Sequence, residues 1–412
     1  MRTRRGPTHR GPIARLLPER LRRPFATLRR DLYWLGRDLR GEGRPFLVRR
    51  APRDRRREVL GSRPLEVRSV VRETPEAITL HLAEPDGRPL TFRAGQFLTL
   101  CLEVDGQPLK RAYSFCTSPL DGPTAAITVK RVPGGRASTW LHRHAEAGLR
   151  LAVLGPSGTF GAPTQGAPHL VLLGGGSGIT PLIAIAETAL RSRPDGRVTL
   201  IYGNRGVDDI IFRRRLADLA ASHAERLRVV HVREDPPPGW TGEVGRLDRA
   251  GVARLLADVD RADAERPGPD DRAYLLCGPL GMMDAAKEVL LERGVPRGAI
   301  REERFQSPAD PLGASAARPE RPLRVRFRRG EEERVVSVAP GQTLLEAALA
   351  AGVGLPFSCT LGGCGACRVR RLGGAVHVDE PSCLSAEERA AGYVLTCVGR
   401  PLDDRVALEV PA

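Results

Sequence analysis

The stretch CTLGGCGAC, residues 359–367, places Cys359, Cys364 and Cys367 within nine residues. Cysteines set this close together are typical of a structural zinc site, a disulfide cluster or an iron–sulfur centre. Five of the eight cysteines fall in the last 54 residues of the chain. The N-terminus lacks the apolar segment of a secretory signal, so we expect a cytoplasmic chain whose cysteines bind metal or act in catalysis rather than form disulfides.

A fourth cysteine, Cys397 in GYVLTC, completes the spacing C-x4-C-x2-C…C that is typical of plant-type [2Fe–2S] ferredoxins. Three glycines between the cysteines, Gly362, Gly363 and Gly365, allow the backbone to wrap closely around a cluster and to adopt positive φ. Zinc sites usually use two short pairs of ligands, and here one half has no pair, which leaves zinc as the weaker alternative. Cys383 is interpreted as a structural thiol. The predicted metal ligands are Cys359, Cys364, Cys367 and Cys397.

The net charge of +16 is concentrated at the start of the chain, where residues 1–60 hold 19 Arg and six Asp or Glu. The rest of the chain has an ordinary balance, so we do not expect it to bind nucleic acid. Within residues 13–40, leucines and one phenylalanine recur at three- and four-residue spacing, with arginines on the other face. This pattern predicts an amphipathic helix that contacts an anionic membrane surface or an acidic partner, or packs on the chain's own body.

The hydrophobic pattern predicts a multidomain β + α/β + α+β protein. Short alternating runs over residues 61–166 favour an antiparallel barrel, and alternating strands and helices over residues 167–305 favour a doubly wound parallel sheet. A Pro/Ala/Ser-rich stretch over residues 306–321 is interpreted as a linker that lets the last domain move. Residues 322–412 form that last domain, around the cysteine loop. In the parallel domain the helices are expected at residues 180–191, 208–221, 247–257 and 280–293.

Two motifs in residues 61–166 suit a dinucleotide such as FAD. In RAYS (111–114), an arginine can pair with a pyrophosphate, a tyrosine can stack on a flat ring and a serine can donate to a ring nitrogen. In VKRVPGGRASTWL (129–141), two glycines precede a helix whose first N–H groups attract a second phosphate. Taken alone, RAYS is equally well explained as a barrel turn. The predicted FAD contacts are Arg111, Tyr113, Ser114, Val129, Lys130, Gly134, Gly135, Ser138 and Thr139.

A glycine-rich loop, LLGGGSGITP (172–181), joins a strand to a helix and can receive a second pyrophosphate. The loop does not match G-x-G-x-x-G, but it opens a parallel α/β domain, which is the context that such a loop needs. CGPLGMM (277–283) follows a later strand and is expected beside it at the carboxyl edge of the sheet. The candidate cofactor-binding residues in these loops and in the strand end between them are Gly174, Gly175, Gly176, Gly178, Thr180, Pro181, Asn204, Arg205, Cys277, Gly278 and Pro279.

The second strand of this domain ends in YGNR (202–205), with no acidic residue before Asp208. An acidic residue there would bind the ribose hydroxyl of NAD, whereas an arginine accommodates the 2′-phosphate of NADP. The sequence therefore favours NADPH over NADH. In the structural alternative, Arg205 simply pairs with Asp208 or Asp209.

The ordered set RAYS, GGxxST, GGGSGITP, YGNR, CGP and E-R-F closely resembles the ferredoxin–NADP reductase superfamily, and LPFSCTLGGCGAC…GYVLTC resembles a plant-type ferredoxin with a β-grasp fold. Over residues 65–412 the chain is similar to the reductases of phenylacetyl-CoA epoxidase, of hybrid-cluster proteins and of fatty-acid desaturases. The resemblance implies FAD, a [2Fe–2S] cluster and NADPH or NADH as cofactors. It places Ser114 near flavin N5, Cys277 near the nicotinamide, Glu303 near the flavin and Phe305 over the ring. These four are the catalytic residues that it implies.

The function that the resemblance implies is electron transfer from NAD(P)H to FAD, then to the [2Fe–2S] cluster and on to a separate acceptor. No oxygenase metal motif lies in this chain, so the acceptor is expected to be another protein: a diiron oxygenase, a desaturase, a cytochrome P450 or a hybrid-cluster protein. The alternative is a redox-sensing, nucleic-acid-binding or membrane-binding protein with little turnover. Contact with the inner membrane face through residues 13–40 stays open at this point.

Overall fold

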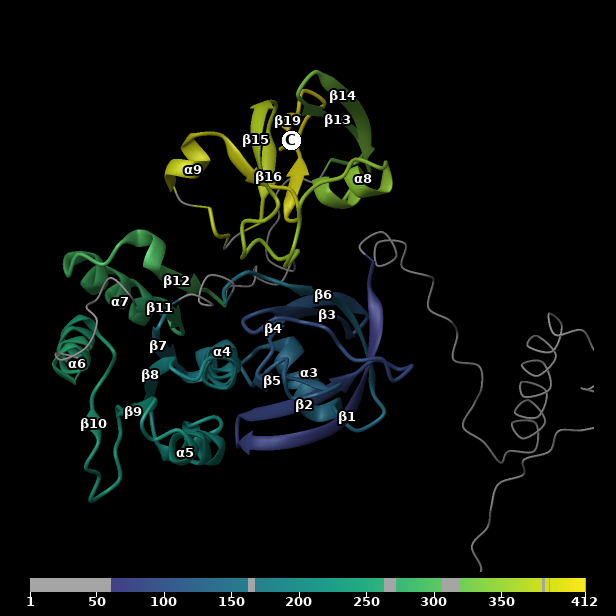
Figure 1. The fold of residues 1–412 in the computed structure, drawn as a ribbon. Coiled ribbons are helices and arrows are strands. Elements are labelled where there is room, and N and C mark those ends of the chain that lie inside the picture. The colour runs from purple at the N-terminus through teal and green to yellow at the C-terminus, as the bar shows by residue number, and fades with distance from the viewer. Residues whose placement is uncertain are drawn as a thin grey trace, which may run out of the picture. The chain divides into compact units, whose positions relative to one another are not determined.

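The computed structural model describes residues 61–161, 167–262, 272–305, 319–379, 382–384 and 386–411 (Figure 1). The amphipathic helix predicted within residues 13–40 lies outside this set, and so does most of the linker predicted over residues 306–321. Among the described residues, no helix is both long and apolar enough to cross a membrane.

The first domain is an antiparallel barrel in which the strands follow the order β4-β3-β6-β1-β2-β5. A bridge between Phe115 and Ile127 joins the edges at β4 and β5, which closes the sheet. One helix, α3, packs against the barrel and contributes the buried Leu141. The elements are β1 (Arg63–Thr74), β2 (Ala77–Ala83), β3 (Phe97–Val104), β4 (Gln107–Ser114), β5 (Ala125–Lys130), α3 (Arg136–His144) and β6 (Arg150–Ser157).

Strand β3 is buried on both faces, which is unusual for a small barrel. Leu98, Leu100 and Leu102 point into the barrel core. The residues between them, Phe97, Thr99 and Cys101, are at most 7% exposed. Because alternate side chains of a strand point to opposite faces, a second layer must cover the outer face of β3.

The second domain is a parallel sheet with the strand order β10-β9-β8-β7-β11-β12, which confirms the doubly wound fold (Figure 1). Alternate residues of β7 enter two separate cores: Leu170 and Leu172 pack with α4 and α5, and Val171 and Leu173 pack with α6 and α7. The elements are β7 (His169–Gly175), α4 (Ile179–Ser192), β8 (Arg197–Asn204), α5 (Arg213–Ser222), β9 (Leu227–Arg233), β10 (Glu243–Val244), α6 (Arg249–Ala262), β11 (Arg272–Cys277), α7 (Leu280–Glu292) and β12 (Ile300–Glu303), with short 3-10 turns at Gly176–Gly178, Val207–Asp209 and Arg297–Ala299.

The helix predicted over residues 208–221 begins only at Arg213. Ile210, Ile211 and Phe212 are all buried, and Phe212 has a left-handed φ of 62°. A residue with left-handed backbone cannot belong to a right-handed α-helix. The chain therefore forms a short 3-10 turn at Val207–Asp209 and a turn through Phe212, and the helix starts only after Phe212.

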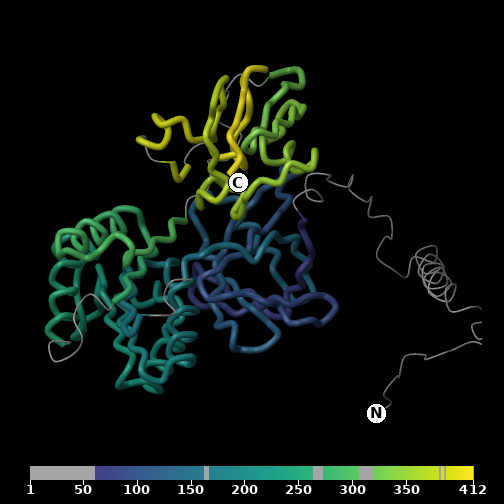
Figure 2. The backbone as a smooth tube through the Cα atoms, turned by 45° about the horizontal axis from the view of Figure 1, so that its top comes forward, coloured from purple at the N-terminus to yellow at the C-terminus, as the bar shows by residue number. Residues whose placement is uncertain are grey.

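The third domain is a five-stranded mixed sheet with the order β14-β13-β19-β15-β17, and β16 pairs with β18 beside it. Its parallel central pair, β13 with β19, and its covering helix α8 agree with the predicted β-grasp fold. Figure 2 shows this domain as the green-to-yellow part of the chain. Thr343 and Glu346 form a capping box that starts α8. The elements are β13 (Leu323–Arg329), β14 (Glu332–Val338), α8 (Leu344–Ala350), β15 (Arg368–Gly373), β16 (Val376–Val378), α9 (Ala386–Ala390), β17 (Tyr393–Leu395), β18 (Gly399–Pro401) and β19 (Ala407–Glu409).

Candidate functional site

The carboxyl ends of β7, β8 and β11 meet at one edge of the parallel sheet, because these strands are adjacent. Gly174 of β7 lies in register with Tyr202 of β8 on one side and with Cys277 of β11 on the other. Cys277 in turn pairs with Glu303 of β12. The fold therefore brings the glycine-rich loop, YGNR, CGP and the acid of EERF to a single edge, as the sequence predicts.

The glycine-rich loop and the CGP loop pack directly against each other. A Cβ on Gly178 would lie 1.9 Å from the carbonyl oxygen of Cys277, and a Cβ on Gly175 would lie 2.6 Å from the ring of Pro279. Gly176 needs its left-handed φ of 52°. Thr180 donates its hydroxyl hydrogen to the Ser177 carbonyl at 3.0 Å, which fixes the start of α4. Only glycine allows this approach, and the N–H groups at the start of α4 remain available for an anion.

A cavity of about 610 Å³ opens at this edge, a volume suited to a nucleotide. The buried amide of Asn204 lines it, and neither polar atom of that amide has a hydrogen-bond partner among the described residues. An orphaned buried amide beside a glycine cradle fits a polar ligand such as a pyridine nucleotide. The lining residues are Lys130, Gly175, Gly176, Gly203, Asn204, Arg205, Asp209, Glu234, Gly245, Arg246, Leu247, Asp248, Pro279, Gly281, Met282 and Ala285.

Two arginines line the cavity, and each is paired with an acid. Arg205 donates to Asp209 at 2.9 Å, which is one of the two structural pairings considered from the sequence. Arg246 donates to Glu234 at 2.9 Å. Both side chains stay largely exposed, so each guanidinium keeps donors for a ligand.

The barrel and the parallel sheet are joined at Ser114 and Glu303. The hydroxyl of Ser114, at the end of β4, donates to a carboxylate oxygen of Glu303 at 2.7 Å. Burial raises the pKa of Glu303 to about 7, although the hydrogen bond from Ser114 lowers it. Burial also raises the pKa of the Cys277 thiol, and the nearby Glu303 carboxylate adds to this shift. Three of the four predicted catalytic residues thus converge from two domains, in a place where proton-transferring groups are typical.

The raised pKa of Glu303 predicts a pH-dependent contribution to stability. The carboxyl group ionises near 4.5 in the unfolded chain and near 7 in the folded protein, so the unfolded chain loses this proton first. The free energy of unfolding should therefore fall by up to about 3 kcal/mol as the pH rises from 4.5 through 7. Urea unfolding of the wild type and of Glu303→Gln at pH 5 and pH 8 measures this difference.

The neighbouring Glu302 provides the control for this measurement. Burial raises its pKa, but hydrogen bonds from Lys287 and Arg304 outweigh burial and lower the pKa overall. Glu302→Gln should therefore leave the high-pH loss of stability in place. Identical pH profiles for the wild type and Glu303→Gln would contradict the assignment.

The predicted FAD contacts lie at the end of β4, at the end of β5 and at the start of α3. Tyr113 is half-buried against the barrel core, and burial raises the pKa of its hydroxyl. Arg111 donates to the Lys110 carbonyl at 2.8 Å. The hydroxyl of Ser138 accepts a hydrogen bond from the Val132 N–H at 3.1 Å and so shapes the loop that holds Gly134 and Gly135. Val129 is buried, and Thr139 is half-buried. Their roles toward FAD stay predictions.

Two predicted residues occupy unexpected surroundings. Lys130, predicted to contact FAD, lines the nucleotide cavity, and its Nζ lies 3.4 Å from where a Cβ on Gly176 would be. Phe305 is 47% exposed, so its predicted place over the flavin ring stays a prediction. Glu234 and Arg246 also line the cavity and were not predicted from the sequence, whereas Met282 belongs to the CGPLGMM loop. Only the arginine in EVGR, directly after a short strand, offered a signal.

The cysteine loop folds around its thiols as a cluster requires. Gly362 and Gly365 adopt positive φ of 76° and 71°, whereas Gly363 does not. The Leu361 N–H donates to the Cys359 thiol at 3.3 Å, as expected for N–H groups aimed at cluster sulfurs. Hydrogen bonds from the thiols of Cys364 and Cys397 lower the pKa of Cys359.

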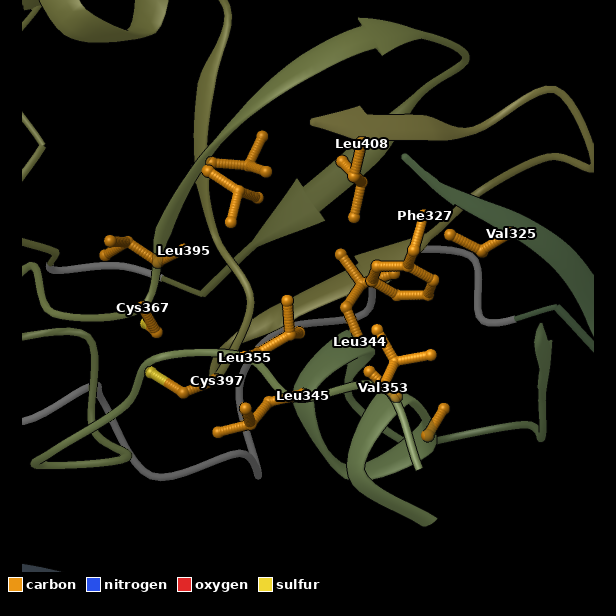
Figure 3. Close-up of a cluster of buried hydrophobic side chains, with 14 of the residues drawn as sticks. Val325, Phe327, Leu344, Leu345, Val353, Leu355, Cys367, Leu395, Cys397 and Leu408 are labelled. Atoms are coloured by element: carbon orange, nitrogen blue, oxygen red, sulfur yellow. The ribbon is translucent and has the colours of Figure 1, made fainter. Parts of the chain in front are cut away.

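All four predicted ligands therefore lie together, and Figure 3 shows Cys367 and Cys397 side by side at the end of the hydrophobic core. Among the described residues, no three potential ligands converge tightly enough for a single metal ion. Each iron of a [2Fe–2S] cluster is bound by only two thiolates, so four thiols in this arrangement suit such a cluster.

Cys383 lies beside this loop. Its N–H donates to the Gly362 carbonyl at 2.9 Å, and its sulfur lies 3.6 Å from where a Cβ on Gly365 would be. The side chain is exposed, which does not fit the interpretation as a structural thiol. Both the backbone N–H and the sulfur of Cys383 thus lie against the cluster loop, although the residue as a whole is exposed.

Three family models match the chain, one for each domain. They are the oxidoreductase FAD-binding domain over residues 64–161, the oxidoreductase NAD-binding domain over residues 172–288 and the 2Fe-2S iron-sulfur cluster binding domain over residues 327–402. They confirm the three predicted cofactors in their predicted order, whereas the exact domain limits stay a prediction.

Several curated proteins are similar over nearly their whole length. One component of the 1,2-phenylacetyl-CoA epoxidase from Escherichia coli is 35% identical, over 84% of this chain and 97% of that protein. The ferredoxin reductase component of 3-ketosteroid-9-alpha-monooxygenase from Mycobacterium tuberculosis is also 35% identical, over 85% of this chain and 98% of that protein. Phthalate dioxygenase reductase shares the fold, with a TM-score of 0.57 at 22% identity over 86% of this chain and 99% of that one.

The Mycobacterium tuberculosis relative is the ferredoxin reductase component of a monooxygenase, and the chain aligns with it and with the epoxidase component over regions that include all three domains. The chain therefore belongs to the family of modular oxygenase reductases, and it is an NAD(P)H-dependent oxidoreductase that passes electrons through FAD and a [2Fe–2S] cluster to a separate protein.

Proposed function

We propose that this reductase takes hydride from NADPH at a site built by Ser114, Cys277 and Glu303, and that it supplies a terminal oxygenase. The 2.7 Å hydrogen bond from Ser114 to Glu303 is the observation that carries the proposal. It joins the predicted flavin motif to the carboxyl edge of the nucleotide-binding sheet, where a nicotinamide and a flavin would have to meet.

When bound, FAD supplies the step from two-electron to one-electron chemistry, and the chain supplies position and environment. Cys277 and the glycine-rich loop together form the surface against which a nicotinamide would pack, because Gly178 lies directly against the Cys277 carbonyl group. Ser114 and Glu303 hold a proton within a partly buried hydrogen bond at the end of β4. With a pKa of about 7, Glu303 can hold or release that proton near neutral pH.

Two arginines support NADPH as the donor. Arg205 and Arg246 both line the cavity beside Asn204, and both keep exposed guanidinium groups that could bind a 2′-phosphate. The acids that pair with them, Asp209 and Glu234, hold the guanidinium groups in place.

Replacing Arg205 with alanine should raise the KM for NADPH about tenfold or more, as expected for one lost charge-assisted hydrogen bond. The KM for NADH should change little, because NADH has no 2′-phosphate. Steady-state flavin reduction with each nucleotide measures both constants. Arg214→Ala, which removes a side chain that is 96% exposed, controls for the loss of one positive charge. Equal effects on NADPH and NADH would argue against a 2′-phosphate contact.

An anaerobic titration tests the proposed donor. NADPH should bleach the flavin absorbance and then the cluster absorbance at lower concentration than NADH. Absence of bleaching with both nucleotides would refute the proposed function.

The acceptor is tested by product formation with purified terminal components, each supplied with this reductase. These components are a diiron oxygenase, a desaturase, a cytochrome P450 and a hybrid-cluster protein. The oxygenase proposal fails if the desaturase or the hybrid-cluster protein alone is reduced.

A further inference from the structure

The outer face of strand β3 meets the cysteine loop of the third domain. Phe97 shares a small apolar cluster with Cys359 and Leu361. Cys101 packs with the hydrophobic core of the third domain. The layer that covers the outer face of β3 is therefore the iron–sulfur domain.

The neighbouring strands extend this contact. Leu154 of β6, which pairs with Thr99, also packs with the core of the third domain. On the other side, Lys110 of β4 lies 4.0 Å from Glu346 of α8. The contact thus spans three adjacent barrel strands, with apolar packing on β3 and β6 and an ion pair at its rim.

One hydrogen bond crosses the centre of this contact. The hydroxyl of Thr99 donates to the carbonyl oxygen of Cys359 at 3.0 Å. Thr99 is 1% exposed and Cys359 is 4% exposed, so water cannot replace either partner. The bond therefore ties a barrel strand directly to the backbone of a predicted cluster ligand.

The other neighbours of Thr99 connect it to the predicted flavin site. In the β-ladder, Thr99 pairs with Ala112, which stands between Arg111 and Tyr113. A continuous path of backbone hydrogen bonds thus runs from RAYS across the ladder to β3 and through the Thr99 hydroxyl to Cys359.

We propose that Thr99 is a positioning residue that couples the flavin site to the iron–sulfur cluster, by holding the Cys359 side of the cluster loop against β3. The inference rests on the proposed function, because it takes RAYS as the flavin motif. In each event one electron leaves the reduced flavin and one ferric iron of the cluster becomes ferrous, while Thr99 keeps its proton and no bond to it breaks. Cys364 of the same loop is exposed, so this part of the loop stays open to an acceptor.

Thr99→Val tests the coupling, since valine keeps the shape of threonine and removes the donor. Anaerobic stopped-flow mixing with NADPH should show flavin reduction at the wild-type rate. Electron transfer from flavin to cluster should be about tenfold slower, as expected for the loss of one buried hydrogen bond. Thr99→Ser keeps a donor and should restore the rate. Thr79→Val, which removes a buried hydroxyl that bonds to Thr128 within the barrel, is the matched control.

A second measurement does not depend on catalysis. Cys101 is 6% exposed because the third domain covers it. In Thr99→Val, alkylation of Cys101 by iodoacetamide, followed by peptide mapping, should be several-fold faster than in the wild type or in Thr79→Val. The proposal is overturned if neither cluster reduction nor Cys101 alkylation changes. If NADPH and NADH both fail to reduce the wild-type flavin, the proposed function fails, while the alkylation result still decides whether Thr99 holds the contact.

Discussion

Replacing Cys397 with alanine is expected to remove the [2Fe–2S] cluster. The protein should lose the visible absorbance of the cluster and the paramagnetic signal of its reduced form, and electron delivery to a separate acceptor should fall to background. Reduction of the flavin by NADPH should continue, because it needs only the first two domains. Cys397 is 6% exposed, and its thiol hydrogen-bonds with those of Cys359 and Cys367. With one ligand missing, an iron lacks a thiolate that no buried neighbour can supply.

Cys383→Ala provides the control for this prediction. Cys383 lies next to the same loop and follows Cys367 in sequence, but its side chain is exposed. The alanine variant should keep the cluster and its spectrum. If the Cys397 variant retained a full cluster and the Cys383 variant lost it, Cys383 would be the cluster ligand and Cys397 would not.

Replacing Gly178 with alanine is expected to slow flavin reduction by NADPH about a hundredfold, the loss that a displacement of about 1 Å at a reacting centre causes. The added Cβ would lie 1.9 Å from the carbonyl oxygen of Cys277, so the glycine-rich loop and the CGP loop must separate. The cluster domain does not contain this contact, and its absorbance should be unchanged. Rapid-mixing measurements of flavin bleaching over a range of NADPH concentrations would separate weaker binding from slower hydride transfer.

Gly298→Ala is the matched control, because a Cβ at Gly298 would meet no atom within 4 Å and the backbone does not need positive φ. That variant should reduce its flavin at the wild-type rate. Wild-type rates in Gly178→Ala as well would show that the two loops need not touch for hydride transfer.

Local patterns in the sequence were sufficient to predict three domains and four cluster ligands. The four cysteines are identifiable because cluster geometry restricts their spacing, and the glycines between them because a tight loop needs positive φ. The strand–loop–helix order around LLGGGSGITP predicts a parallel sheet, and parallel strands bring their carboxyl ends to one edge. Local chemistry therefore determines which loops are functional.

The features that were not predicted correctly from the sequence depend on contacts between residues that lie far apart in the chain. The start of α5 at Arg213 follows from the left-handed backbone of the buried Phe212, which the apolar pattern over residues 208–221 does not indicate. Lys130 of the barrel stays a predicted cofactor contact, but its place in a cavity of the second domain was not predicted. Its neighbours in sequence contain no sign of that cavity.

The sequence by itself determined the three cofactor-binding domains and their order, and it predicted the cofactor-binding loops and the ligand set of the cluster. The tertiary structure decided how these parts meet: Ser114 beside Glu303 across 189 residues, and Thr99 beside Cys359 across 260. The physical reason is that spacing and periodicity report only neighbours along the chain. A hydrogen bond between domains depends instead on which apolar faces pack together, and β3, apolar on both faces, is the strand that joins the barrel to the iron–sulfur domain.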